Sequence, residues 1–519
     1  MAAASAPVVP LVDQTDVAAF LASGRALGCR TPPRRIDTHS ATIFLGRDRA
    51  WKLKRPVQLG YLDFSTPGRR HDALQAELLL NRRTAPDLYL AVHPITRDSE
   101  GRLALDGDGD AVEWLLEMRR FPDGALLEDI AAAGTLDEAM LVQLADTIVD
   151  FHRDAEVARE AAGAGIPRAI VRGNAASMAM FPDILPPTNA RTVCAKHLGL
   201  IERHQSLLEC RARNGKVRHG HGDLHLANIA MIGGRATPFD CLEFDPDLAM
   251  IDVLYDLAFV LMDCWHRGLR SAANVLFNRY LDRSPDDETG IVLLPLFLSM
   301  RAAIRAHVLA AQSRRALTDE TLADRARAYL ALATELLMPR AKYLVAIGGL
   351  SGTGKSAVAR ALASELGSPP GARILRSDVI RKRAAGVLPE TKLTPAHYER
   401  AISSRVYATL DQLAGAALAQ ESAVVADAVF ARREERDAIE KVAQRAGISF
   451  SGLWLEADET VRVRRVVDRL ADASDAGARV ARAQESIDVG DIDGWHRVDA
   501  DAALSAVVGE AAAILRAPK

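Results

Sequence analysis

Short apolar runs alternate with polar turns over the first 120 residues of the chain. The turn Gly46-Arg47-Asp48-Arg49 separates two of these runs, which predicts a β-hairpin. From His71 to Arg83, apolar residues recur at helical spacing and predict a helix. The expected strands are 42–45, 50–53, 89–95 and 114–118. This part of the chain is therefore predicted to form strands and one principal helix.

Long helical stretches replace this pattern after Gly134. The expected helices are 136–153, 192–213, 252–266, 290–312 and 320–337. Two short apolar strands, 229–232 and 237–239, interrupt them among His, Asp, Asn and Glu residues. A lobe of strands followed by a lobe of helices predicts a cleft between the two lobes.

The helical pattern stops near Met338-Pro339-Arg340, and strands then alternate with helices. The expected strands are 343–347, 373–376, 423–427 and 450–455, and the expected helices are 355–366, 396–419, 432–446 and 459–471. This alternation predicts a parallel sheet with helices on both faces. We therefore expect a domain at 1–338, with a small lobe at about 30–120 and a helical lobe at about 121–338, and a second domain at 340–519. The expected fold class is α/β and α+β.

Composition and charge narrow the possible partners. The 519 residues are 49% hydrophobic and 26% charged, which is typical of a globular chain of several domains. Lys+Arg total 65 against 68 Asp+Glu, so long nucleic acid and anionic membranes are unlikely partners. The longest aliphatic run, 291–300, is too short to cross a bilayer. The five cysteines include no C-x-x-C pair, and we expect a cytoplasmic protein without a zinc site.

A glycine-rich motif follows the first strand of the second domain. Gly349-Leu-Ser-Gly-Thr-Gly-Lys-Ser356 fits G-x-x-x-x-G-K-[ST], between a predicted strand and a predicted helix. In such a loop the backbone N–H groups cradle phosphates, Lys355 adds a positive charge, and Ser356 is a Mg²⁺ ligand. The expected ATP-binding residues are Gly349, Ser351, Gly352, Thr353, Gly354, Lys355 and Ser356.

Two carboxylates follow later strands of this domain. Asp427 ends an apolar strand and is expected to support Mg²⁺. Asp378 is a candidate general base, with Arg381 one helical turn later to clamp an anion; a helix N-cap role for Asp378 is the alternative. Downstream arginines, Arg462, Arg465 and Arg469, share one helical face as a candidate lid, although the pattern does not decide which of them acts.

A second set of catalytic residue types lies between 221 and 240. In His221-Gly-Asp-Leu-His-Leu-Ala-Asn228, Asp223 is the candidate base and Asn228 a magnesium ligand. Asp240 follows the next strand pair as the other magnesium ligand. The predicted nucleotide lysine is Lys52, paired with Glu77, with Lys54 as the alternative, and Met118 lies in the predicted hinge to adenine. Three nearby acids, Glu243, Asp245 and Asp247, are interpreted as a solvated loop.

These motifs resemble two known families. Residues 35 to 335 resemble the aminoglycoside phosphotransferase family, through Trp51-Lys52, Glu77, His221-Gly-Asp223 with Asn228, Phe239-Asp240 and Tyr255-Asp256-Leu-Ala258. This resemblance implies a protein-kinase-like bilobal fold, although no G-x-G-x-x-G loop precedes the lysine. Residues 342 to 475 resemble a P-loop kinase family of the polynucleotide kinase and zeta-toxin group, through Gly349–Ser356, Asp378-x-x-Arg381, Asp427-x-x-Phe430 and Arg469. The order of these motifs is similar to a two-domain fusion, in which Asp378 is implied to be the base and Arg381 the phosphate clamp.

Together these motifs predict a bifunctional ATP-dependent phosphotransferase with two magnesium–ATP sites and small-molecule hydroxyl acceptors. Two alternatives remain: one half is a nucleotide-sensing regulatory module, or the C-terminal half phosphorylates nucleic-acid ends. The pattern does not indicate the acceptor of either domain, the coupling of the two reactions or the oligomeric state.

Overall fold

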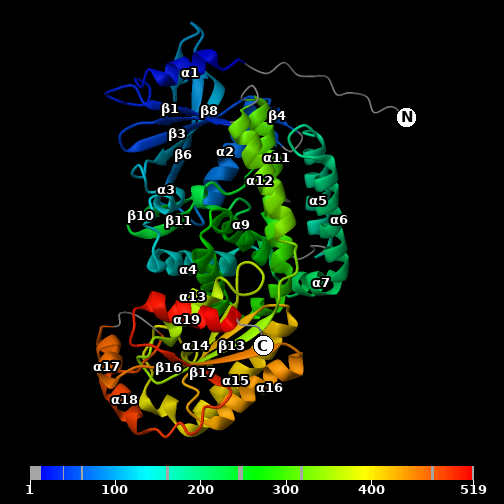
Figure 1. Cartoon of the computed structure of the whole chain (residues 1–519). Helices are drawn as coiled ribbons and strands as arrows, with labels where there is room; N and C mark the ends of the chain where they lie inside the picture. Colours follow the sequence, from blue (N-terminus) through cyan, green and yellow to red (C-terminus); the bar gives the residue numbers. More distant parts are fainter. Residues whose placement is uncertain are drawn as a thin grey trace. The chain divides into compact units, whose positions relative to one another are not determined.

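The computed structural model describes residues 13–38, 40–59, 62–158, 163–243, 249–315, 319–468 and 473–516 (Figure 1). Contacts divide the chain into two compact units. The first contains the chain up to Ile166 together with Glu209–Phe259. The second contains Pro167–Leu208, Val260–Ser313 and the C-terminal part of the chain. Each unit is described below by itself.

An antiparallel sheet of six strands begins the first unit, in the order β1-β2-β3-β8-β6-β7. Its strands are β1 (Arg34–Asp37), β2 (Ala41–Leu45), β3 (Arg49–Lys54), β6 (Tyr89–Arg97), β7 (Leu103–Leu105) and β8 (Asp110–Arg119). The predicted hairpin is confirmed, because Gly46 N donates to Arg49 O at 2.9 Å and β2 pairs with β3. The shorter strands β4 (Gln58–Leu59) and β5 (Leu62–Asp63) pair separately.

The two faces of this sheet bury different residues of β3. Trp51 and Leu53 pack on one face with Val17 and Leu21 of α1 (Thr15–Ala22). The alternate residues, Lys52 and Lys54, therefore lie on the other face, where helix α2 (Pro67–Asn81) also packs. The strand period thus places two lysines on the face that α2 covers.

Helices and short strand pairs complete the first unit. The predicted pair is confirmed as β10 (Ile229–Ile232) against β11 (Arg235–Pro238). A second pair, β9 (Val217–His219) with β12 (Met250–Asp252), had no predicted counterpart. The remaining elements are α3 (Leu127–Ala132), α4 (Glu138–Asp154), η1 (Leu226–Asn228) and the start of α9 (Val253–His266).

Helices form the N-terminal part of the second unit. They are α5 (Gly165–Ala179), α6 (Pro187–Arg203), the start of α7 (Gln205–Arg213), the rest of α9, α10 (Arg270–Arg283), η2 (Pro285–Leu293), α11 (Leu294–Arg315) and α12 (Glu320–Glu335). The prediction of one helix over 192–213 is wrong, because the chain turns out of the helix at His204. The sequence analysis also missed α10, because buried Asn274 and Asn278 interrupt its apolar pattern.

A parallel sheet of five strands forms the C-terminal part, in the order β14-β15-β13-β16-β17. The strands are β13 (Tyr343–Gly348), β14 (Arg373–Arg376), β15 (Val424–Asp427), β16 (Ser449–Glu456) and β17 (Trp495–Asp499). Four were predicted. The fifth, β17, was not, because it is an edge strand with exposed His496 and Arg497 rather than a continuous apolar run.

Helices cover both faces of this sheet, as the sequence predicts. Leu344 and Ala346 of β13 pack on one face with residues of α15 and α16, and Val345 and Ile347 pack on the other with residues of α13 and α19. The helices are α13 (Lys355–Ala363), α14 (Ser377–Ala384), η3 (Pro395–Tyr398), α15 (Arg400–Ala419), α16 (Arg433–Ala446), α17 (Glu459–Val467), α18 (Ala478–Ala483), η4 (Gln484–Ser486) and α19 (Leu504–Arg516). In such sheets ligands bind at the carboxyl ends of the strands.

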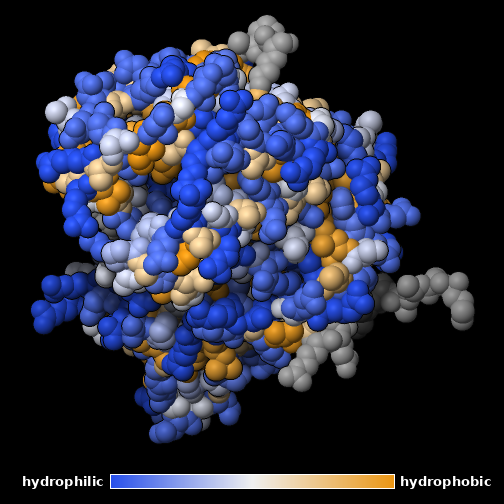
Figure 2. Space-filling view, turned by 90° about the horizontal axis from the view of Figure 1, so that it is seen from below, coloured by the Kyte–Doolittle hydropathy of each residue, from blue (hydrophilic) through white to orange (hydrophobic). Residues whose placement is uncertain are grey.

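Within the described parts of the chain, one helical stretch, Pro285–Arg315, is long and apolar enough to cross a membrane by length and composition. However, 67% of its most apolar window is buried inside the protein, which is typical of a core helix. The face of the molecule in Figure 2 is mainly hydrophilic, with hydrophobic residues scattered over it.

Candidate active sites

The first candidate site contains a network of buried charges around Glu77 of α2. Lys52 Nζ lies 2.7 Å from Glu77 Oε1 and 2.7 Å from Asp240 Oδ1. Lys54 Nζ lies 2.7 Å from Glu77 Oε2 and also pairs with Glu243. Burial acts to lower the pKa of Lys52, but Asp240 and Glu77 outweigh it and hold this pKa well above its usual value. Both predicted lysines therefore lie in the site, but Lys52 is the one that forms an ion pair with Asp240, whereas Lys54 pairs with Glu243.

Glu243 corrects part of the sequence interpretation. Its side chain is 10% exposed and paired with Lys54, so it does not belong to a solvated loop. Asp245 and Asp247 lie outside the described residues. The periodicity of β3 could have suggested a second acid, because two lysines on one buried face need more than one carboxylate.

A buried carboxylate holds the loop that follows β9. Asp256 of α9 accepts hydrogen bonds from His221 N at 2.6 Å and Gly222 N at 2.9 Å. A Cβ at Gly220 would lie 2.7 Å from Asp256 Oδ2, so this close approach requires glycine. Asp256 had no predicted role beyond its place in the Tyr255-Asp256-Leu-Ala258 motif, although an acid within the apolar run 253–262 is a usable signal.

Asp223 and Asn228 lie together in this loop, as predicted. Asn228 Nδ2 donates to Asp223 Oδ2 at 2.9 Å and to Asp223 O at 3.0 Å. His221 supports the loop, because its ring contacts Phe239 O at 3.0 Å and accepts from Asp223 N at 3.4 Å. Burial lowers the pKa of His221, so the neutral ring that this arrangement requires is favoured.

Asp240 follows β11 with a left-handed backbone, at φ 61°. Its N–H donates to Tyr89 Oη at 3.0 Å, and the next N–H, of Cys241, donates to Asn81 Oδ1 at 2.8 Å. Burial acts to raise the pKa of Asp240, but Lys52 outweighs it and holds this pKa below its usual value. The carboxylate therefore stays ionised, as a metal ligand must. The predicted hinge residue Met118 lies near the end of β8, opposite Ala50 of β3.

The glycine-rich loop of the second unit joins β13 to α13, as predicted. Gly349 and Gly352 have φ of 136° and 92°, and a Cβ would lie 2.5 Å from Leu455 O and 2.4 Å from Arg462 O respectively. Gly354 is the N-cap of α13 in a left-handed conformation. Lys355 Nζ donates to Leu350 O at 3.0 Å. Only glycines allow this backbone path, and it leaves the loop at a helix N-terminus that favours anions.

Ser356, Asp427 and Arg376 meet at the carboxyl ends of β14 and β15. Ser356 Oγ donates to Asp427 Oδ2 at 2.6 Å, and Arg376 donates to Ser356 Oγ at 3.0 Å. Arg376 Nε also lies 3.3 Å from Asp427 Oδ2. The sequence analysis gave Arg376 no role, although its place at a strand end beside Asp378 is the signal that would have found it.

Asp378 lies in the first turn of α14, whose N-cap is Arg376, so the N-cap alternative is wrong. Burial raises the pKa of Asp378, Asp427 adds to the rise, and Arg376 and Lys355 oppose it. Arg381 donates instead to His397 O at 2.7 Å and lies over the Tyr398 ring at 4.7 Å. Its clamp role therefore remains a prediction.

The candidate lid arginines lie in different surroundings. Arg462 is buried and donates to Ala481 O at 3.1 Å, whereas Arg465 lies 3.5 Å from Thr353 O of the phosphate loop. Arg469 lies outside the described residues. The phosphate loop also makes a contact that was not predicted: Gln484 Oε1 accepts a hydrogen bond from Ser351 N at 2.7 Å.

Comparison with known proteins finds a family model for part of the chain and a relative over most of its length. A family model described as "AAA domain" matches residues 344–487. An uncharacterized protein of Mycobacterium tuberculosis (strain ATCC 25618 / H37Rv) is 28% identical over 488 residues, which cover 92% of this chain and 95% of that protein.

Two solved structures also show likenesses. A choline/ethanolamine kinase family protein from Mesorhizobium loti is 13% identical, with TM-score 0.37, over 63% of this chain and 95% of that chain. A gluconokinase from Sinorhizobium meliloti 1021 is 22% identical, with TM-score 0.25, over 34% of this chain and 91% of that chain.

One candidate site lies in each unit. The first unit contains Lys52, Glu77 and the loop from Asp223 to Asn228, and the second contains a parallel sheet with the glycine-rich loop after its central strand. We call the two candidate sites the kinase-like site and the P-loop site.

The donor atoms of both sites fit magnesium and ATP. The kinase-like site offers the Asn228 amide and the Asp240 carboxylate, and the P-loop site offers the Ser356 hydroxyl and the Asp427 carboxylate. Among the described residues, no group of three or more His, Cys, Asp or Glu could hold a metal ion. Mg²⁺ suits such sparse sites, because it is usually held by one or two carboxylates and by substrate phosphates. All five cysteines are free.

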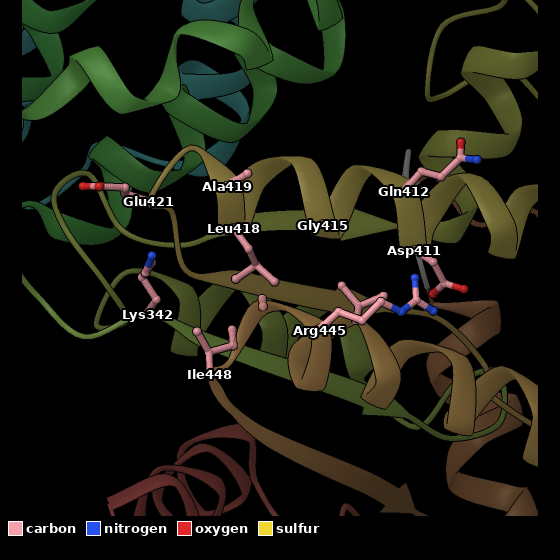
Figure 3. A pocket seen from close by; sticks show the side chains of 11 residues that line it. Lys342, Asp411, Gln412, Gly415, Leu418, Ala419, Glu421, Arg445 and Ile448 are labelled. Atoms are coloured by element: carbon pink, nitrogen blue, oxygen red, sulfur yellow. The ribbon is translucent and has the colours of Figure 1, made fainter. Parts of the chain in front are cut away.

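A cavity of about 440 Å³ lies between α15 and α16 of the second unit. Figure 3 shows Lys342 and Glu421 at one end and Asp411 and Arg445 at the other, with Leu418 and Ile448 between them. None of the predicted site residues lines it.

Proposed function

We propose that this protein is an ATP-dependent phosphotransferase with two magnesium–ATP sites, each transferring a phosphoryl group to the hydroxyl of a small-molecule acceptor. The observation that carries the proposal is the position of Lys52 between Glu77 and Asp240, in the unit where Asn228 is bonded to Asp223. A lysine–glutamate pair, a catalytic-loop Asp and Asn, and a later metal-binding Asp are the parts that phosphoryl transfer requires.

In the kinase-like site, Glu77 and Asp240 keep Lys52 charged and oriented toward the phosphates. Asn228 and Asp240 would hold Mg²⁺, which supplies charge neutralisation for the transferring phosphoryl group. Asp223 orients the acceptor hydroxyl and takes its proton. The hydrogen bond from Asn228 fixes the Asp223 carboxylate for this role.

In the P-loop site, the backbone N–H groups of 351–356 and Lys355 bind phosphate oxygens. Ser356 and Asp427 would hold Mg²⁺, and their direct hydrogen bond at 2.6 Å supports a shared role. Asp378 is the proposed base, because its raised pKa suits proton transfer better than that of an ordinary aspartate. Arg376 pairs with Asp427 and partly opposes the rise that burial causes in the pKa of Asp378.

The test uses the full chain with Mg²⁺ and ATP, and measures phosphate release and nucleotide binding. Asp223→Asn should lower the turnover of the kinase-like site by at least 100-fold, because a positioned base contributes about 10²–10⁴-fold. The turnover of the P-loop site should remain in that variant, and Lys355→Ala should remove it. The matched controls are Asp154→Asn and Lys342→Ala, two exposed positions that should leave both components unchanged. Unchanged turnover in both active-site variants would refute the proposal.

A further inference from the structure

The outer edge of the P-loop sheet is covered by side chains of helix α10. Strand β14 pairs with β15 on one side only, so its other side would leave backbone groups without partners. Asn278 fills that edge: its Nδ2 donates to Ala372 O at 3.1 Å, and its Oδ1 accepts from Ile374 N at 2.7 Å. One amide thus satisfies the C=O and the N–H on either side of residue 373, which is how a neighbouring parallel strand would pair.

A second asparagine, one helical turn earlier, strengthens the same contact. Asn274 Nδ2 donates to Ala372 O at 3.0 Å and to Pro370 O at 3.2 Å. Gly371, at φ 105°, allows this approach, because a Cβ there would lie 2.8 Å from Asn274 Nδ2. Both asparagines are buried. Buried amides are costly unless they are hydrogen-bonded, so this edge is a fitted contact.

Arg373 of β14 provides a charged clamp beside this contact. Its guanidinium lies 2.7 Å from Asp282 Oδ1 of α10 and 2.9 Å from Glu288 Oε1 of η2. It also donates to Asn278 Oδ1 at 3.1 Å. Arg373 is only 2% exposed, so both carboxylates compensate a desolvated charge. These ion pairs hold β14 to α10 and η2 in addition to the amide hydrogen bonds at its edge.

The held strand leads directly to the P-loop site. Arg376, its last residue, bonds to Ser356 and Asp427, and Asp378 follows in the first turn of α14. The phosphate loop instead follows β13, the central strand of the sheet. A shift of β14 would therefore displace Arg376 and Asp378 from a phosphate loop that stays intact.

We propose that Asn278 is a positioning residue of the P-loop site: by completing the edge of β14, it places Arg376 and Asp378 against Ser356 and Asp427. This inference rests on the function proposed above for that site. It also means that helices α10 and η2, which the sequence places in the N-terminal domain, are part of the P-loop module. A P-loop module that includes α10 and η2 therefore begins before residue 340.

The test uses the full chain with Asp223→Asn, so that only turnover dependent on Lys355 remains. Asn278→Asp keeps the acceptor for Ile374 N but loses the donor to Ala372 O, and Asn278→Ala loses both. We expect phosphate release from Mg·ATP to fall by about 10- to 100-fold, since misplacement by about 1 Å can cost 10²-fold. The dissociation constant of Mg·ADP should change less than about threefold, because phosphate contacts depend on β13.

The matched control is Arg270→Gln on the same helix, which removes an exposed contact with Glu365 at 3.0 Å and leaves β14 untouched. It should keep the parent rate. An unchanged rate in both Asn278 variants, or a fall matched by an equal loss of Mg·ADP-binding sites, would overturn the inference, because the latter is simple unfolding.

Hydrogen exchange of the segment 372–378 provides a second measurement in the same variants. Faster exchange at Ile374 together with a normal phosphate loop supports the positioning role even if the acceptor chemistry of the proposed function fails. Unchanged exchange there would contradict it. Loss of all Lys355-dependent turnover and Mg·ADP binding in the parent chain would instead refute the proposed function.

Discussion

The kinase-like site and the P-loop site offer similar groups for the same ligand but are built differently. The kinase-like site draws its charged groups from β3, α2, the loop after β9 and the segment after β11, and its lysines are buried among carboxylates. The P-loop site takes most of its groups from one stretch of eight residues and adds strand ends. The first therefore depends on buried long-range ion pairs, and the second on local backbone geometry.

The largest difference should appear in stability. Glu77→Gln leaves Lys52 and Lys54 buried with one carboxylate fewer, so we expect the free energy of unfolding to fall by about 3–5 kcal/mol. Asp427→Asn should cost less, about 2 kcal/mol, because it removes one carboxylate partner of Arg376 while the amide oxygen can still accept from Ser356. Urea unfolding followed by tryptophan fluorescence measures both. Arg102→Gln, at an exposed pair, is the control. Equal losses for the two acidic positions would break the comparison.

The two lysines of the kinase-like site should differ in turnover. Lys52→Met should lower Asp223-dependent turnover by about 10²–10³-fold, because it removes a charge aimed at the transferring phosphate. Lys54→Met should lower it much less and mainly reduce stability, because Lys54 pairs with Glu77 and Glu243. Steady-state kinetics in a Lys355→Ala background separates the cases. A larger kinetic loss at Lys54 would reverse the assignment.

Acid should affect the two sites differently. Burial raises the pKa of Asp378, whereas Lys52 outweighs burial and lowers that of Asp240. As the pH falls, Asp378 gains its proton at a higher pH than an ordinary aspartate, and below that point Lys355-dependent turnover should fall tenfold per pH unit. Asp240 should remain ionised to a lower pH. The measurement is the pH profile in the Asp223→Asn chain. An acid limb at or below the ordinary aspartate pKa would contradict the role of Asp378.

The smallest expected effect concerns the phosphate loop. The Gln484 amide oxygen accepts from Ser351 N–H, a group that we propose binds the nucleotide phosphates. Gln484→Ala should tighten Mg·ADP binding at the P-loop site by up to about tenfold, because one competing hydrogen bond contributes about 1 kcal/mol. Calorimetry in the Asp223→Asn chain measures this, with Gln444→Ala, at an exposed glutamine, as the control. Weaker binding would mean that Gln484 supports the loop rather than competing with its ligand.

The sequence predicted the P-loop site more completely than the kinase-like site, because most groups of the P-loop site are neighbours along the chain. Gly349, Gly352 and Gly354 have positive φ angles, and their spacing along the chain is enough to identify the loop. In the kinase-like site, by contrast, the spacing within the loop predicted Asp223 and Asn228 but not the buried pairing of Glu243 or the support from Asp256. Motif spacing describes groups that are neighbours in the chain, and it is silent about distant partners.

Sequence-based prediction also missed an edge strand and a helix that buries polar residues. Strand β17 does not alternate, because His496 and Arg497 are adjacent and both exposed, and α10 lacks an apolar period because it buries Asn274 and Asn278 against β14. In both cases tertiary contacts replaced the periodicity on which sequence prediction depends. The same contacts place α10 in the second unit, together with the P-loop sheet.

By itself the sequence determined the local pieces: a glycine-rich loop between a strand and a helix, a loop that brings Asp223 and Asn228 together, and a parallel sheet covered on both faces. Only the tertiary structure decided which lysine meets Asp240, 188 residues away, and which amide completes β14. Local backbone geometry is specified by adjacent residues, whereas a buried charge or amide takes whichever partner packing brings to it, and no spacing along the chain records that choice.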